Sequence, residues 1–83
     1  MIQVTLYRSP GCHLCDRARA VLAEAKDELG FELIEVDISG SAELEAEYRE
    51  WLPVVEIDGE RAFVYYVDPN GLRRKVARVA GGE

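Results

Sequence analysis

The chain has 83 residues, 48% of them hydrophobic and 31% charged, and its formal net charge is −6. This length allows one small domain, residues 1–83, and the negative charge argues against a nucleic-acid-binding protein. No stretch approaches the roughly 20 apolar residues of a membrane span, and the N-terminus lacks a charged leader before an apolar run. We therefore expect a cytoplasmic domain whose partner is neither nucleic acid nor a membrane.

The first half of the chain predicts a strand, a helix and a second strand. Residues 2–7, IQVTLY, alternate apolar and polar side chains, which is typical of a strand. From Cys12 the apolar residues take helical spacing as far as Leu29, and Gly30 is well placed to end the helix. Residues 31–38, FELIEVDI, favour a strand because β-branched and aromatic residues are frequent there.

The second half begins with a helix and a hairpin. Residues 42–51, AELEAEYREW, carry acidic residues where the first turn of a helix would lie. Trp51 would either form part of a substrate platform or end this helix in the core, and we expect the core position. The pair DG, residues 58–59, is a strong hairpin-turn signal between residues 53–57 and residues 62–67. These two segments should therefore be antiparallel strands.

The last segment follows a turn signature. Residues 68–71, DPNG, match a type I turn. Residues 72–79 place apolar side chains at helical spacing, although a further strand would also tolerate this segment. The order β-α-β-α-β-β-α predicts an α/β fold, in which helices flank a mixed four-stranded sheet and right-handed crossovers join the parallel strands.

Two cysteines, Cys12 and Cys15, stand where the first strand-to-helix turn ends. The free N–H groups and positive end of the helix would stabilise a Cys12 thiolate, which lowers the thiol pKa from its usual value of about 8.5. We expect Cys15, one turn further on, to be more buried and to resolve a mixed disulfide formed at Cys12. In a reducing compartment such a pair indicates redox or metal chemistry rather than a structural bridge.

Two basic side chains lie near this pair in the sequence. His13, if protonated, would favour the Cys12 thiolate further; the alternative is a solvent-facing residue with little effect. Arg8 either lends positive charge and receives an acidic substrate group, or is an exposed loop arginine.

Other interpretations of the two cysteines stay open. A zinc site needs four ligands, and the chain offers one CxxC with its single histidine inside it, which disfavours zinc in a monomer. An iron–sulfur cluster would need further ligands from a second molecule or from glutathione. Two inert core cysteines would also fit the pattern, since free cysteine is often buried.

Three segments together resemble a known family: SPGCHLCDRA at the first helix, FELIEVDI, and LPVVEIDG, residues 52–59. They make the chain similar to small glutaredoxin-like proteins of the thioredoxin-fold superfamily. The resemblance implies that fold, a cis-proline at Pro53, and a Leu52 backbone free to pair with an extended substrate beside Cys12. The glycine pair with which glutaredoxins hold glutathione is not evident.

The resemblance implies a thiol–disulfide oxidoreductase that cycles between a Cys12–Cys15 disulfide and a dithiol. Its substrate would be a protein or small-molecule disulfide, and its electrons would come from glutathione or a thioredoxin-reductase-like enzyme. No metal or organic cofactor is implied, and we expect a monomer. The alternatives are an iron–sulfur or metal carrier that uses Cys12 as a ligand, and a non-catalytic binding module that uses the Leu52–Pro53 edge.

Overall fold

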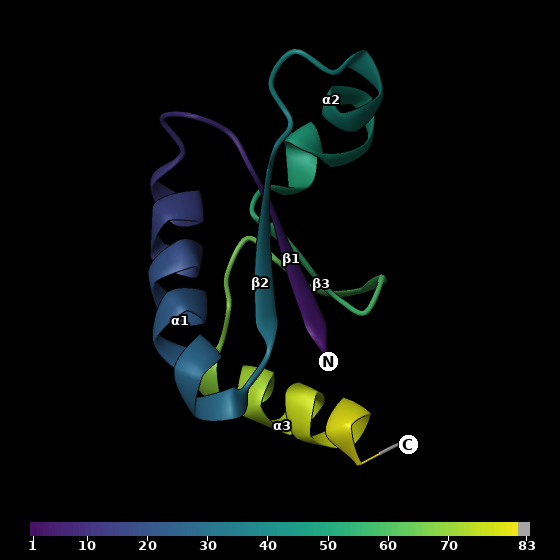
Figure 1. Ribbon diagram of the computed structural model, residues 1–83. Helices are drawn as coiled ribbons and strands as arrows, with labels where there is room; N and C mark the ends of the chain where they lie inside the picture. The colour runs from purple at the N-terminus through teal and green to yellow at the C-terminus, as the bar shows by residue number, and fades with distance from the viewer. Residues whose placement is uncertain (82–83) are drawn as a thin grey trace.

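A mixed four-stranded sheet organises the chain in the computed structural model, which describes residues 1–81 (Figure 1). The strands have the spatial order β2-β1-β3-β4. β2 pairs parallel with β1, and β3 pairs antiparallel with both β1 and β4. The predicted α/β fold is therefore confirmed. The strands are β1 (Gln3–Arg8), β2 (Glu32–Asp37), β3 (Val54–Ile57) and β4 (Glu60–Val64).

The helices cover the two faces of this sheet unequally. The main core cluster joins β1 residues Val4 and Leu6 to buried side chains of the first and last helices. Successive strand residues point to opposite faces, so Tyr7 belongs to a second cluster, which the middle helix covers. The helices are α1 (His13–Leu29), α2 (Ala42–Tyr48) with a short 3-10 helix η1 (Arg49–Trp51), and α3 (Pro69–Ala80).

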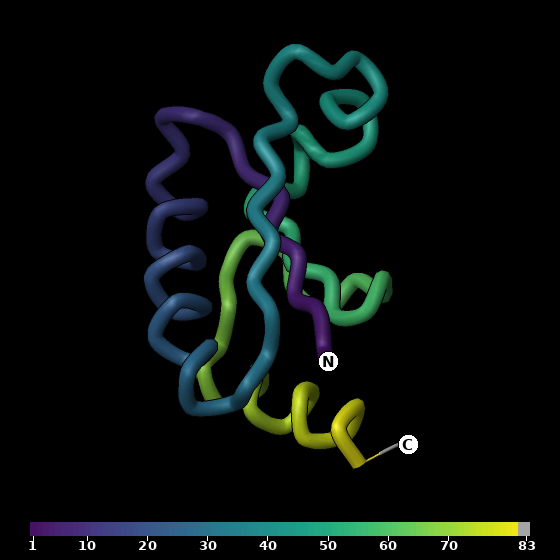
Figure 2. Tube along the Cα trace, viewed as in Figure 1, coloured from purple at the N-terminus to yellow at the C-terminus, as the bar shows by residue number. Residues whose placement is uncertain are grey.

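The parallel pair β1–β2 fixes where the loops lie. Because the two strands run in the same direction, the chain leaves both of them at one end of the sheet (Figure 2). The loop from β1 to α1 begins there, and so does the segment that leads from β2 to α2. Arg8 and Asp37, the last residues of the two strands, are partners in the ladder.

Helix α1 begins and ends where the sequence predicts. Cys12 is its N-cap, with an extended backbone. Gly30 ends it in the left-handed conformation at φ 75°, and its N–H donates to the Lys26 carbonyl at 2.9 Å. A left-handed residue at this position favours glycine. The helix buries Cys15, Ala18 and Leu22, whereas Leu14, the first of the apolar residues at helical spacing, is exposed.

Three predictions about the second half were wrong in detail: the bounds of β4, the separate DPNG turn and the burial of Trp51. Strand β4 starts at Glu60 and ends at Val64 rather than covering residues 62–67, because the two turn residues both have positive φ and pair Glu60 directly with Ile57. It ends early because Tyr65 adopts φ 69°, which is incompatible with a strand.

The DPNG segment is the first turn of α3 rather than a separate turn. Asp68 is the N-cap and accepts a hydrogen bond from the Gly71 N–H at 3.1 Å, while Pro69 occupies the first helical position. The helix predicted for the last segment is thus confirmed, and a strand there is wrong.

Trp51 does not enter the core, because its side chain is 42% exposed. Regular α-helix stops at Tyr48, and the tighter η1 turn follows. Trp51 ends this turn, and its ring lies against that of Tyr65, with the centroids 6.0 Å apart, at the surface rather than in the core.

No helix within residues 1–81 combines the length and apolar character that crossing a membrane would require.

Tyr48 fastens α2 to the sheet. Its ring stacks on Tyr7 with centroids 4.0 Å apart and an interplanar angle of 11°. Its hydroxyl donates to one oxygen of Glu56 at 3.0 Å, and the Tyr7 hydroxyl donates to the other at 3.4 Å. Burial, followed by side-chain hydrogen bonding with Tyr7 and with Glu56, raises the pKa of Tyr48 well above its usual range.

We expect Tyr48→Phe to lower the free energy of unfolding by about 1–2 kcal/mol, because Glu56 loses a donor in a partly buried site. The folded phenol stays neutral while the unfolded one ionises near its usual pKa. The stabilisation is therefore full below about pH 10 and declines above it, where the two proteins should converge. Urea unfolding at pH 7 and pH 10.5 measures both effects. Tyr66→Phe, at a 67% exposed residue, is the matched control; equal stability of the Tyr48→Phe variant and the wild type would contradict this role.

Candidate active site

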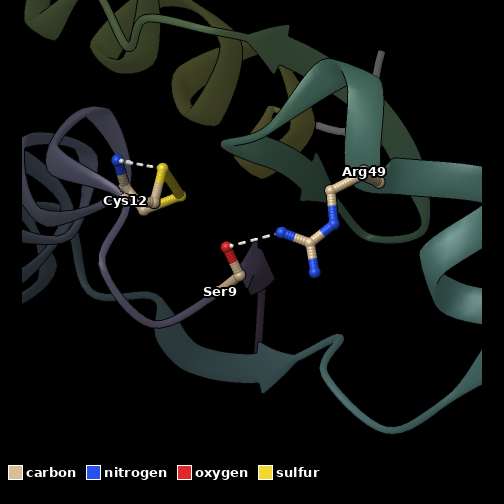
Figure 3. The surroundings of a disulfide bond; sticks show 4 residues. Ser9, Cys12 and Arg49 are labelled. Atoms are coloured by element: carbon tan, nitrogen blue, oxygen red, sulfur yellow. Dashed lines mark hydrogen bonds between the residues drawn. A yellow bond between two sulfur atoms is a disulfide. The ribbon is translucent and has the colours of Figure 1, made fainter.

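Cys12 and Cys15 form a disulfide at the first turn of α1 (Figure 3). Their Cα atoms lie 5.2 Å apart, within the usual range for a bridged pair. Cys15 is completely buried, whereas Cys12 is partly exposed. The predicted greater burial of Cys15 is confirmed, while the roles of attacking and resolving thiol stay predictions.

The N-terminus of α1 provides a hydrogen-bond donor and positive potential at the sulfur of Cys12. As the N-cap, its Sγ accepts a hydrogen bond from the Cys15 N–H at 3.2 Å. A negative charge on this sulfur would therefore face an N–H donor and the positive end of the α1 dipole. Gly11, at φ 77°, makes the turn that brings Cys12 to this position.

The loop before β3 packs beside the cysteines. Leu52 belongs to the same buried cluster as Cys15, and Cys12 packs against that cluster. The Leu52–Pro53 peptide bond is cis. Strand β3 begins only at Val54, so the Leu52 backbone lies outside its ladder. The structure thus brings together the predicted residues Cys12, Cys15 and Leu52.

Arg8 is the last residue of β1 and is half buried, so its interpretation as an exposed loop arginine was wrong. Its Nε is buried without a hydrogen-bond partner in residues 1–81. The Asp37 carboxylate accepts a hydrogen bond from the Ser39 backbone N–H at 2.8 Å. Hydrogen bonds from Ser39 lower the pKa of Asp37, and the charges of Arg8 and Arg49 lower it further.

Ser9 and Arg49 are site residues that sequence reasoning missed. Arg49 Nη1 donates to the Ser9 hydroxyl at 3.3 Å, and its guanidinium also pairs with Glu45 at 2.6 Å. In Figure 3 the Arg49 guanidinium points toward Ser9 in the surroundings of the disulfide. Forty positions separate the two residues in sequence, so no local pattern could have joined them.

His13 is exposed as the first residue of α1. Its exposure matches the solvent-facing alternative, but its effect on Cys12 stays a prediction. Within residues 1–81, no three His, Cys, Asp or Glu side chains are grouped so that they could share a metal ion.

This sheet order, with a CxxC pair opening the first helix, defines a protein of the thioredoxin fold. The chain is similar to chloroplastic thioredoxin z with a TM-score of 0.80, over 98% of this chain and 80% of that one, at 13% identity. A likeness at this identity concerns the fold alone.

The chain belongs to the family described as Glutaredoxin-like domain (DUF836), whose model matches residues 3–77. It is 38% identical to the uncharacterized protein Rv0508 of Mycobacterium tuberculosis, over 96% of this chain and 88% of that protein. It is 32% identical to protein XcR50 from X. campestris, whose X-ray structure aligns with a TM-score of 0.77 over 90% of this chain and 96% of that one. The resemblance drawn from the sequence is confirmed.

We expect the reduced Cys12 thiol to have a pKa clearly below about 8.5, because the helix end stabilises its thiolate. The measurement is the rate of iodoacetamide alkylation against pH in a Cys15→Ser variant, followed by mass spectrometry. The same variant unfolded in urea supplies the unperturbed value. A folded value at or above the unfolded one would show that the helix end does not activate this thiol. A His13→Gln substitution in that background tests the imidazole, since a raised thiol pKa would assign it an electrostatic role.

Proposed function

We propose that this protein is a thiol–disulfide oxidoreductase that reduces or exchanges disulfides through Cys12 and Cys15. One observation carries the proposal: the partly exposed sulfur of Cys12 caps α1 and is bonded to a fully buried Cys15. Family membership and the thioredoxin fold support redox capacity for this pair. Neither names the substrate.

The reaction has two exchange steps. The Cys12 thiolate attacks one sulfur of a substrate disulfide, forms a mixed disulfide with it and expels the other sulfur as a thiolate. Cys15, once deprotonated, attacks the Cys12 sulfur and releases the second substrate thiolate. Two electrons pass to the substrate, whose two thiolates take up protons, and the protein is left with the Cys12–Cys15 disulfide. Two molecules of glutathione, which become glutathione disulfide, or a thioredoxin-reductase-like partner supply the two electrons that restore the dithiol.

Neighbouring residues would position the substrate. The backbone of Leu52, beside Pro53 and outside the β3 ladder, would pair with an extended substrate segment. Arg8, half buried at the end of β1, would receive an acidic group of the substrate. His13 at the exposed start of α1 would add positive charge near Cys12 when protonated. We propose that the protein works as a monomer, in the cytoplasm, where the dithiol form is maintained.

We expect Cys12→Ser to lose disulfide-reducing activity completely, since it removes the attacking sulfur. Cys15→Ser should retain the first step and accumulate a mixed disulfide at Cys12, because no second thiol releases the substrate. Turnover of a small disulfide such as hydroxyethyl disulfide, together with the mass of the intact variants after reaction, measures both effects. Full turnover by Cys12→Ser would end the proposal.

A further inference from the structure

Most of the exposed large hydrophobic side chains in the described part of the chain gather around the site. Within residues 1–81 the large hydrophobic side chains that stay exposed are those of Met1 and four others: Leu14, Trp51, Tyr65 and Tyr66. Leu14 lies between the two cysteines in α1, and Trp51 immediately precedes the Leu52–Pro53 loop. The Tyr65 N–H donates to the Pro53 carbonyl at 2.9 Å, which brings the third segment to the same loop. Concentrated exposed apolar surface is typical of a binding site.

This surface is held in place by specific contacts. Tyr65 adopts φ 69°, which is unfavourable for a residue other than glycine. Besides its bond to Pro53, its hydroxyl donates to the Glu50 carbonyl at 3.1 Å. Its ring also lies against that of Trp51, with the centroids 6.0 Å apart. A backbone kept in an unfavourable conformation by surrounding contacts is frequent at functional sites.

A small cavity opens beside Leu14. The side chains of Leu14, Tyr65 and Tyr66 line it together with buried Ala18 and Val67, and Arg17 adds the positive charge at its edge. Its volume is about 50 Å³, less than two waters occupy in the liquid at about 30 Å³ each. A space of this size and lining fits the end of one aliphatic side chain.

We propose that Leu14, Trp51, Tyr65 and Tyr66 bind an extended segment of a partner protein that carries an aliphatic side chain next to its disulfide. The surface would thereby select protein disulfides over glutathione disulfide. This inference rests on the proposed function, because the occupant must present a disulfide to Cys12.

The chemistry of the surface favours this occupant. Aromatic side chains are frequent anchors of protein–protein contacts. Here Tyr65 and Tyr66 line the cavity together with buried Ala18 and Val67. Glutathione is a polar, negatively charged tripeptide without an aliphatic side chain to fill the cavity. An extended protein segment would fill it while its backbone pairs at Leu52.

The test uses the prereduced protein in single turnover with three symmetrical disulfides. These are the dimer of a short peptide with leucine next to its cysteine, the same dimer with serine there, and glutathione disulfide. No reductant other than the protein dithiol is then present, and thiol release gives a second-order rate constant for each. We expect the leucine dimer to react about tenfold faster than the serine dimer, since truncating an anchored apolar group has an effect of this order.

Substitutions at two exposed positions test whether the preference for the leucine dimer comes from the proposed surface. Leu14→Ser and Tyr66→Ser should each remove most of the preference for the leucine dimer and leave the rate with glutathione disulfide unchanged. Tyr66→Phe keeps the apolar ring and should behave as the wild type. Circular dichroism and the rate of Cys12 alkylation check that the fold and the thiol are intact.

The outcomes separate the two proposals. If the wild type reduces all three disulfides equally, prefers glutathione disulfide, or keeps its preference in both serine variants, the selectivity is overturned while the oxidoreductase function stands. If the wild type reduces none of them, the function fails and the selectivity fails with it.

Discussion

The parallel pairing of β1 with β2 is the constraint on which the site depends. Two parallel neighbours need a crossover, and α1 provides it by running back along the sheet. The N-terminus of α1 must therefore lie where β1 ends. Cys12, the last residue before the helix, is placed by this topology at the positive end of the helix dipole.

Burial of the second cysteine and attachment of α2 depend on one apolar cluster. Cys15, Tyr48, Leu52 and Val54 are all buried in it, and they come from α1, α2, the loop before β3, and β3 itself. The hydrogen bond that Glu56 on β3 accepts from Tyr48 anchors α2 to the sheet. The position of Leu52 beside the cysteines is thus a consequence of core packing as much as of the loop itself.

Sequence patterns located the elements and the cysteines because both are local. The period of α1, its glycine end and the spacing of Cys12 and Cys15 are all contained in a short stretch of chain. The contact between Arg49 and Ser9 depends on how α2 docks, which no local pattern encodes. Trp51 is exposed where regular α-helix has ended and its ring meets that of Tyr65, and β4 ends early because of one φ angle at Tyr65. Propensities do not resolve such single-residue events.

The contacts around Cys12 divide the site into two parts. Thiol reactivity depends on the N-terminus of α1, where the Cys15 N–H meets the sulfur. Much of the surface that the proposed substrate would meet comes from other segments, namely Arg8 at the end of β1, Trp51 after α2, and Tyr65 after β4, whereas Leu14 belongs to α1 itself. Since these segments do not form the helix end, their side chains can change without altering the geometry at the sulfur. Under the proposed function, the same exchange chemistry would therefore be directed to different disulfides by changing the residues around the sulfur, and in this chain most of the exposed large apolar side chains there are aromatic.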